Sequence, residues 1–75
     1  MNVKMQIAKG NIERETAKAY LIDIDGREIW FPKSQVTIDI PSPIQPGSII
    51  MPKWLAKKYN LLRRDNFYNR TYEEV

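Results

Sequence analysis

The dipeptide Asp25-Gly26 is the feature that most constrains what this 75-residue chain can fold into. Both residues adopt positive φ at low cost, as a two-residue type I′ turn requires. A two-residue loop also fixes the register of the arms that leave it. The sequence therefore predicts a β-hairpin in which Ile24 faces Arg27, with the further pairs following in register along both arms.

The predicted register gives the hairpin one apolar face and one mixed face, because neighbouring residues of a strand point to opposite sides. The apolar face is expected to join the core and consists of Tyr20, Ile22, Ile24, Ile29 and Phe31. The mixed face is acidic toward the tip, at Asp23 and Glu28, and apolar at its base, at Ala19, Leu21 and Trp30. Another element is therefore expected to pack on Leu21 and Trp30, and a short helix over Pro52–Tyr59 is predicted to cover them.

Further strands are predicted by the period-two alternation of apolar and polar residues before and after the hairpin. They span residues 3–7, 36–40 and 48–51, with a turn at 9–11. Gln45-Pro46-Gly47 fits a type II turn, in which glycine takes a positive φ. Residues 12–19 also allow a helix, although the β-branched and aromatic run that follows argues against one.

A short amphipathic helix is predicted over Lys53–Tyr59, after Pro52 and before Asn60, which can end a helix at positive φ. The sum is a mainly β fold: a small five-stranded antiparallel meander or partly open barrel with one short C-terminal helix. The barrel would be of the Src-homology-3-like (SH3-like) or oligonucleotide-binding-like (OB-like) kind. We expect a single β-rich domain over 1–64 and a polar tail over 65–75 that frays.

The side chains that usually perform catalysis or hold metals are scarce. Cysteine and histidine are absent, which removes disulfides, thiolate chemistry and the commonest zinc ligand and general base. Asp23 and Glu28 face each other near the hairpin tip and could share a proton or a metal ion. Two solvated carboxylates are the favoured interpretation, so we expect no enzymatic activity, no cofactor and no metal.

The predicted helix and the residues after it form a basic run interleaved with aromatic side chains. Its cations are Lys53, Lys57, Lys58, Arg63 and Arg64, with no acidic residue between them. Such a surface displaces counterions from phosphates while aromatic rings stack on bases, and the net charge of +3 is compatible with it. Partner binding and a plain solvated helix face both stay open, with Trp54 favoured as a core residue.

A second candidate surface is the segment Trp30–Gln35. In one interpretation Trp30 and Phe31 fill opposite faces of the sheet, and the polar residues after them cap a corner. In the other, Lys33 and Gln35 are polar contacts at a barrel rim, beside an exposed Trp30. The first interpretation is favoured, because one or two buried aromatic residues are ordinary in a hairpin.

The same segment is part of a resemblance to known proteins. The strings concerned are Thr16-x-Lys18-Ala19-Tyr20-Leu21, Asp25-Gly26-x-Glu28-Ile29-Trp30-x-Pro32-Lys33-Ser34-Gln35 and Pro52-x-Trp54-Leu55-Ala56-x-Lys58. Over residues 16–62 the chain resembles small proteins of bacterial and archaeal viruses and plasmids that share a Trp-x-Pro-Lys-Ser-Gln motif. The resemblance implies a mobile-element origin and an accessory role near replication or recombination, and it supplies no catalytic residues. Phe31 departs from it, since an aliphatic residue is more typical there.

Two functions are expected as alternatives. The first is a nucleic-acid-binding module with little sequence preference, in a viral or mobile-element setting. The second is a protein-interaction module, such as a viral inhibitor or adaptor of a host protein, that uses exposed strand edges. Self-association through an edge strand or the helix is compatible with either. No apolar run approaches the roughly 18 residues that span a bilayer, so we expect no membrane partner and a cytoplasmic location, in the host cell if the protein is viral.

Overall fold

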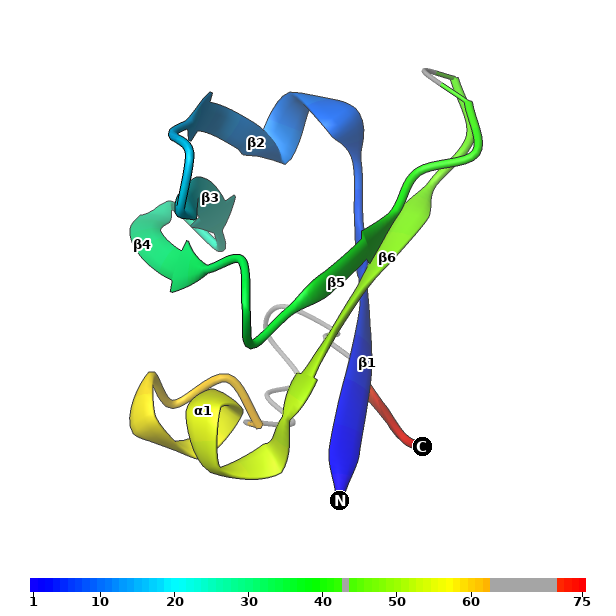
Figure 1. Ribbon diagram of the computed structural model, residues 1–75. Helices are drawn as coiled ribbons and strands as arrows, with labels where there is room; N and C mark the ends of the chain where they lie inside the picture. Colours follow the sequence, from blue (N-terminus) through cyan, green and yellow to red (C-terminus); the bar gives the residue numbers. More distant parts are fainter. Residues whose placement is uncertain (43, 63–71) are drawn as a thin grey trace.

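The computed structural model describes residues 1–42, 44–62 and 72–75, which form two antiparallel β-sheets and one short α-helix (Figure 1). The elements in chain order are β1 (Asn2–Ile7), the 3-10 turn η1 (Lys9–Asn11), β2 (Ile12–Glu15), β3 (Ala19–Ile24), β4 (Arg27–Pro32), β5 (Thr37–Asp39), β6 (Gly47–Pro52), α1 (Lys53–Lys58) and β7 (Tyr72–Glu74). The predicted mainly β, antiparallel fold with one short helix is confirmed.

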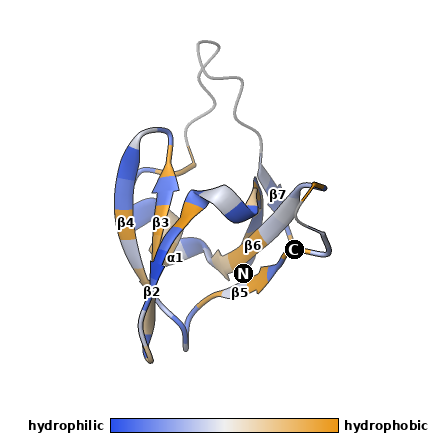
Figure 2. Ribbon diagram, turned by 90° about the horizontal axis from the view of Figure 1, so that it is seen from above, coloured by the Kyte–Doolittle hydropathy of each residue, from blue (hydrophilic) through white to orange (hydrophobic). Residues whose placement is uncertain are grey.

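The strand order differs from the predicted five-stranded meander. The described residues form seven strands, in a four-stranded sheet with the order β5-β6-β1-β7 and a three-stranded sheet with the order β2-β3-β4. The two sheets form separate layers, which Figure 2 shows on opposite sides of the molecule. No ladder in the described part of the chain joins the layers, so they meet through their side chains and do not close into a barrel.

The β3–β4 hairpin has the predicted register. Ile24 pairs with Arg27, and the pairing continues without a shift through Leu21 and Trp30 to the base of the hairpin. The two turn residues both have positive φ, 55° at Asp25 and 81° at Gly26, as a type I′ turn demands. The prediction from this dipeptide is therefore confirmed in both turn type and register.

The predicted strands at 3–7, 36–40 and 48–51 are confirmed as β1, β5 and β6, whereas the helix alternative for residues 12–19 is wrong. Residues Ile12–Glu15 pair with β3 as β2, and the pairing skips one residue between Ile12 and Arg14. Such a bulge lets Ile12 pack against the core while Arg14 is paired with Leu21 on the other face. The charged residues that suggested a helix thus occupy an exposed edge strand.

The core lies between the two sheets and is built from their facing sides. The hairpin contributes the predicted apolar face, with Tyr20 packing against its margin. The buried core consists of Val3, Met5, Ile7, Ile22, Ile24, Ile29, Phe31, Val36, Ile49, Met51, Leu55, Ala56 and Leu61. Burial of these side chains is the main favourable contribution to folding in so small a domain.

The helix α1 closes one end of this core instead of covering the mixed face of the hairpin, so the predicted cover is wrong. Its residues Leu55 and Ala56 belong to the same core as Phe31, and the Tyr59 ring meets the Phe31 ring edge-on at 5.9 Å between centroids. Phe31 lies on the opposite side of β4 from Trp30. The reason is connectivity, because α1 follows directly from β6 and packs against β6 and β1 (Figure 1).

The ends of α1 follow the predicted sequence signals. Pro52 precedes the helix with an extended ψ of 144°, and Asn60 takes the left-handed conformation with φ 59° just after it. The N–H of Leu61 donates to the carbonyl of Ala56 and the N–H of Asn60 to that of Lys57, the two bonds of a Schellman motif. Leu61, buried after the turn, supplies the hydrophobic contact of that motif.

Gly47 is required for a different reason from the predicted one. It is the first residue of β6 and has no positive φ, so the expected type II turn at Gln45-Pro46-Gly47 is wrong. A Cβ at this position would lie 2.3 Å from the carbonyl oxygen of Asp39 and 2.7 Å from Ile40 Cγ1. Only glycine allows the backbone to approach this closely.

The end of the predicted tail forms part of the four-stranded sheet. Residues Tyr72–Glu74 form β7, which pairs antiparallel with β1. Asn2 and Val75 exchange backbone hydrogen bonds of 3.2 and 2.8 Å at the end of this ladder. The rest of the predicted tail, up to residue 71, lies outside the described residues.

Candidate nucleic-acid interface

The exposed side of α1 carries an indole between positive charges. Leu55 and Ala56 are buried, whereas Lys57 and Lys58 are exposed and Trp54 is 57% exposed. Positions three and four residues apart lie on one side of a helix, so Trp54 is next to both lysines. The prediction that Trp54 fills the core is wrong, because Leu55, Ala56 and the residues after the helix already close it.

A third cation reaches this surface from the hairpin tip. The Arg27 guanidinium donates a 2.7 Å hydrogen bond to the carbonyl of Tyr59, at the C-terminal end of α1. Arg27, Lys57 and Lys58 therefore gather where the unpaired carbonyls of a helix attract positive charge. Sequence reasoning missed Arg27, although its pairing with the buried Ile24 puts it on the inner face of the hairpin, toward the helix. We call Arg27, Trp54, Lys57 and Lys58 the α1 face.

Lys53 is predicted for the same surface, but it is held in an ion pair. Its Nζ lies 2.6 Å from the Glu74 carboxylate, and this hydrogen bond and charge raise the pKa of Lys53. The ion pair links the start of α1 to β7. Lys53 is thus less available to a partner than Lys57 and Lys58, while Arg63 and Arg64 lie outside the described residues.

The Trp30–Gln35 segment does not form one rim. Lys33 lies 2.5 Å from the Glu15 carboxylate, with its Nζ 4.9 Å from the centre of the Tyr20 ring. Tyr20 is on the core side of the hairpin, whereas Trp30 points to the opposite side and is 46% exposed. Gln35 is exposed beyond β4. The predicted group therefore divides: Lys33 is held by Glu15 and Tyr20 at the surface, whereas Trp30 is open to solvent on the other side of the hairpin.

Carboxylates meet across the outer face of the three-stranded sheet. The side chain of Glu13, at the bulge in β2, hydrogen-bonds to Glu28 on β4, and this bond is the main cause of a raised pKa at Glu13. Asp23 on the intervening β3 adds repulsion that raises the pKa of Glu13 further, while Arg14 lowers it. The strongest influence on Glu13 thus comes from Glu28, two strands away, which the sequence did not indicate.

This contact predicts a pH-dependent effect of Glu13→Gln. Because the folded chain raises the pKa of Glu13 above its ordinary value of 4.5, protonation favours folding, and this stabilisation is lost as pH rises through the folded pKa. At pH 7 the Glu13→Gln variant should therefore have a higher melting temperature than the unchanged chain, and the gain should shrink toward pH 4.5. Thermal melts followed by circular dichroism at both pH values test this. A Glu15→Gln control breaks the pair with Lys33 and should give no gain at pH 7.

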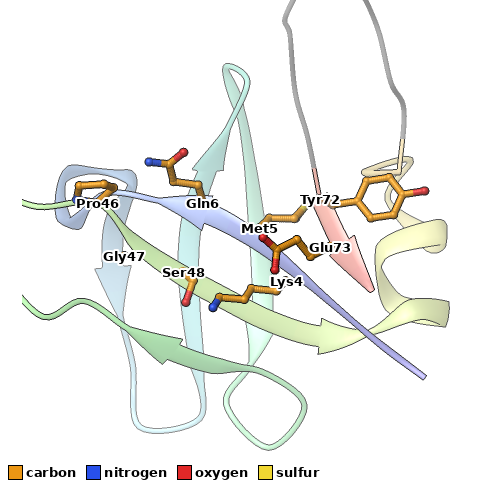
Figure 3. Close-up of a pocket in the computed structure, with 8 residues that line it drawn as sticks. All are labelled: Lys4, Met5, Gln6, Pro46, Gly47, Ser48, Tyr72 and Glu73. Carbon is orange, nitrogen blue, oxygen red and sulfur yellow. The ribbon is translucent and has the colours of Figure 1, made fainter. Parts of the chain in front are cut away.

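A shallow pocket of about 260 Å³ opens on the outer side of the four-stranded sheet (Figure 3). Its lining residues are Lys4, Met5, Gln6, Pro46, Gly47, Ser48, Tyr72 and Glu73. Lys4 on β1 and Glu73 on β7 are cross-strand partners, so a positive and a negative group face the same space. Their opposite charges select no single sign of ligand, and the pocket does not include the α1 face.

The described residues contain no group of three acidic side chains arranged to hold a metal ion. Nor do they include a helix long and apolar enough to cross a membrane. Comparisons with protein-family models, curated proteins and solved structures find no match to this chain.

Proposed function

We propose that the protein binds single-stranded nucleic acid through the α1 face. The observation that carries the proposal is the 57% exposure of Trp54 beside Lys57 and Lys58. An indole exposed to this extent is a ready stacking platform, and cations around it attract the phosphates of the same strand. Arg27 extends the positive charge past the end of the helix.

A single strand suits this surface better than a duplex. The helix has six residues and is about 9 Å long, too short to read several base pairs along a major groove. The bases of a duplex are stacked on one another, whereas those of a single strand can stack on Trp54. Stacking and phosphate contacts discriminate weakly among bases, so little sequence preference is expected.

The wider fold and the family resemblance are compatible with this proposal. Two packed antiparallel sheets with a helix at one end support an open relative of the SH3-like and OB-like barrels, which include many nucleic-acid-binding modules. The resemblance of residues 16–62 to proteins of viruses and plasmids suggests an accessory role near replication or recombination, in the cytoplasm of the host. The protein acts in this proposal by binding and not by catalysis.

Fluorescence anisotropy with labelled single-stranded DNA, single-stranded RNA and duplex DNA tests the proposal directly. We expect the single strands to bind more tightly than the duplex, and binding to weaken between 50 and 200 mM salt on the order of tenfold if two to three phosphates are contacted. No binding at tens of micromolar protein, or binding indifferent to salt, contradicts the proposal.

The double variant Lys57→Ser/Lys58→Ser should weaken single-strand binding and flatten its dependence on salt. Removing two phosphate contacts should reduce the slope of log affinity against log salt by about 1.4 for a single strand. A double variant that removes the same charge elsewhere, Lys9→Ser/Lys18→Ser, is the matched control, because both lysines are exposed and remote from α1 in the sequence. Equal slopes for the two double variants would locate binding outside the α1 face.

A further inference from the structure

The outer face of the three-stranded sheet is an unpartnered surface with two distinct parts. One part is a cross-strand row of Arg14 on β2, Leu21 on β3 and Trp30 on β4. The other is the neighbouring row toward the hairpin tip, where Asp23 pairs with Glu28. We call these residues together with Glu13 the outer sheet face.

Trp30 makes this face apolar as well as acidic. Its indole is 46% exposed, although the cross-strand Leu21 beside it is buried. Core packing does not account for Trp30, since Phe31 and Ile29 already supply the buried side of β4. A large aromatic side chain held on a rigid strand and open to solvent is typical of a contact residue.

The carboxyl groups beside Trp30 outnumber the positive charge on the same face, which is Arg14. Glu28 and Asp23 both raise the pKa of Glu13, so the three carboxyl groups act on one another across the sheet. Oδ1 of Asp23 is shielded from solvent and has no hydrogen-bond partner among the described residues. Arg14 lowers the pKa of Glu13, but the acidic groups outweigh it, since the pKa of Glu13 is raised on balance. A cation supplied from outside would relieve this arrangement.

We propose that the outer sheet face docks an arginine-bearing segment of a partner protein. A guanidinium is planar, so it can stack on the exposed Trp30 indole, and its N–H groups can also bind a carboxylate at two points. Glu28 and Trp30 are two residues apart on one strand, about 7 Å, and arginines at alternate positions of an extended segment have the same spacing. One arginine then covers Trp30 while the next binds the Glu13–Glu28 pair.

This occupant is favoured by charge complementarity. Phosphates are repelled by Glu13, Asp23 and Glu28, so this face does not suit a nucleic-acid strand. The two faces also contain different elements, the outer side of β2–β4 and the exposed side of α1. The docking of an arginine-bearing segment therefore stands independently of the proposed nucleic-acid binding.

The test is a titration of the ¹⁵N-labelled protein with a capped peptide that has arginine at three alternate positions separated by alanine. The two indole N–H signals are assigned with Trp30→Phe and Trp54→Phe variants. We expect the peptide to shift the Trp30 signal and leave the Trp54 signal in place. The same peptide with glutamine in place of arginine should give no shift, and a lysine version should bind several-fold more weakly, because an ammonium does not stack as a plane.

Two variants sharpen the test. Glu13→Gln/Glu28→Gln keeps the size and hydrogen-bonding capacity of both side chains while removing their charge, and should weaken peptide binding at least tenfold. Lys57→Ser/Lys58→Ser should leave peptide binding unchanged, which separates this site from the α1 face. A peptide that shifts the Trp54 signal alone, shifts neither signal, or binds the double glutamine variant equally well overturns the proposal.

Discussion

Phe31→Ala should destabilise the domain by about 3–5 kcal/mol, the usual cost of truncating a fully buried phenylalanine. Phe31 has no exposed surface, lies in the core between the sheets, and holds the Tyr59 ring at the end of α1 by an edge-on contact. A small domain has a total stability of only about 5–15 kcal/mol, so the variant should have a melting temperature near or below 37 °C. Urea denaturation followed by circular dichroism at 25 °C measures the loss.

The adjacent residue provides the matched control for this prediction. Trp30→Ala removes an even larger side chain, but Trp30 is on the solvent side of the same strand and is 46% exposed. We expect its denaturation midpoint to move much less than that of Phe31→Ala. If the two variants lost equal stability, the outer face of β4 would have to be packed in solution.

Trp54→Ala should weaken binding to single-stranded DNA or RNA by about 1–3 kcal/mol, or roughly 5- to 150-fold, if one base stacks on this indole. The loss should differ from that of the lysine variants because it should leave the salt dependence unchanged. Stacking releases no counterions, whereas a phosphate contact does. Anisotropy titrations at two salt concentrations distinguish the two effects.

Two controls accompany the Trp54→Ala measurement: an aromatic replacement at the same position, and a check that each variant is folded. Trp54→Phe keeps a stacking ring and should recover much of the affinity that alanine loses. Because Trp54 is 57% exposed, neither variant should shift the denaturation midpoint strongly. Unchanged affinity in a folded Trp54→Ala variant would remove the indole from the binding surface and with it the main support for the proposed function.

The parts of the fold that could be predicted from the sequence are those determined by neighbouring residues. Asp25-Gly26 fixes turn type and register locally, so the whole β3–β4 pairing follows from two residues. Asn60 likewise ends α1 through its own backbone preference. Local signals of this kind do not depend on where distant segments pack.

The parts that were predicted wrongly depend on distant contacts. The position of α1 follows from its packing against β6 and β1, which no pattern within 53–59 specifies. Gly47 shows the same limit, because the need for glycine comes from the backbone of Asp39 eight residues earlier. The strand β7 was missed because Tyr72–Glu74 is short and polar and pairs with β1, which is distant in the sequence.

The candidate site, like the fold, could be predicted only in part from the sequence. The i, i+3, i+4 spacing of Trp54, Lys57 and Lys58 is readable from the sequence, but which side of the helix is exposed depends on the core. The charge of a lysine is also readable, whereas its partner is not. Lys33 and Lys53 are engaged by Glu15 and Glu74, which are 18 and 21 residues away, so only the structure separates them from Lys57 and Lys58.

The position of β1 between β6 and β7 has a consequence for the order of folding during synthesis. The strand β1 is synthesised before both of its neighbours and cannot be paired until residues 47–52 and then 72–74 have followed it. The β2–β4 strands, by contrast, are consecutive in the chain and can pair as soon as residue 32 is free. We therefore expect the three-stranded sheet to form first and the four-stranded sheet to be completed late, with β1 exposed to other chains in the interval.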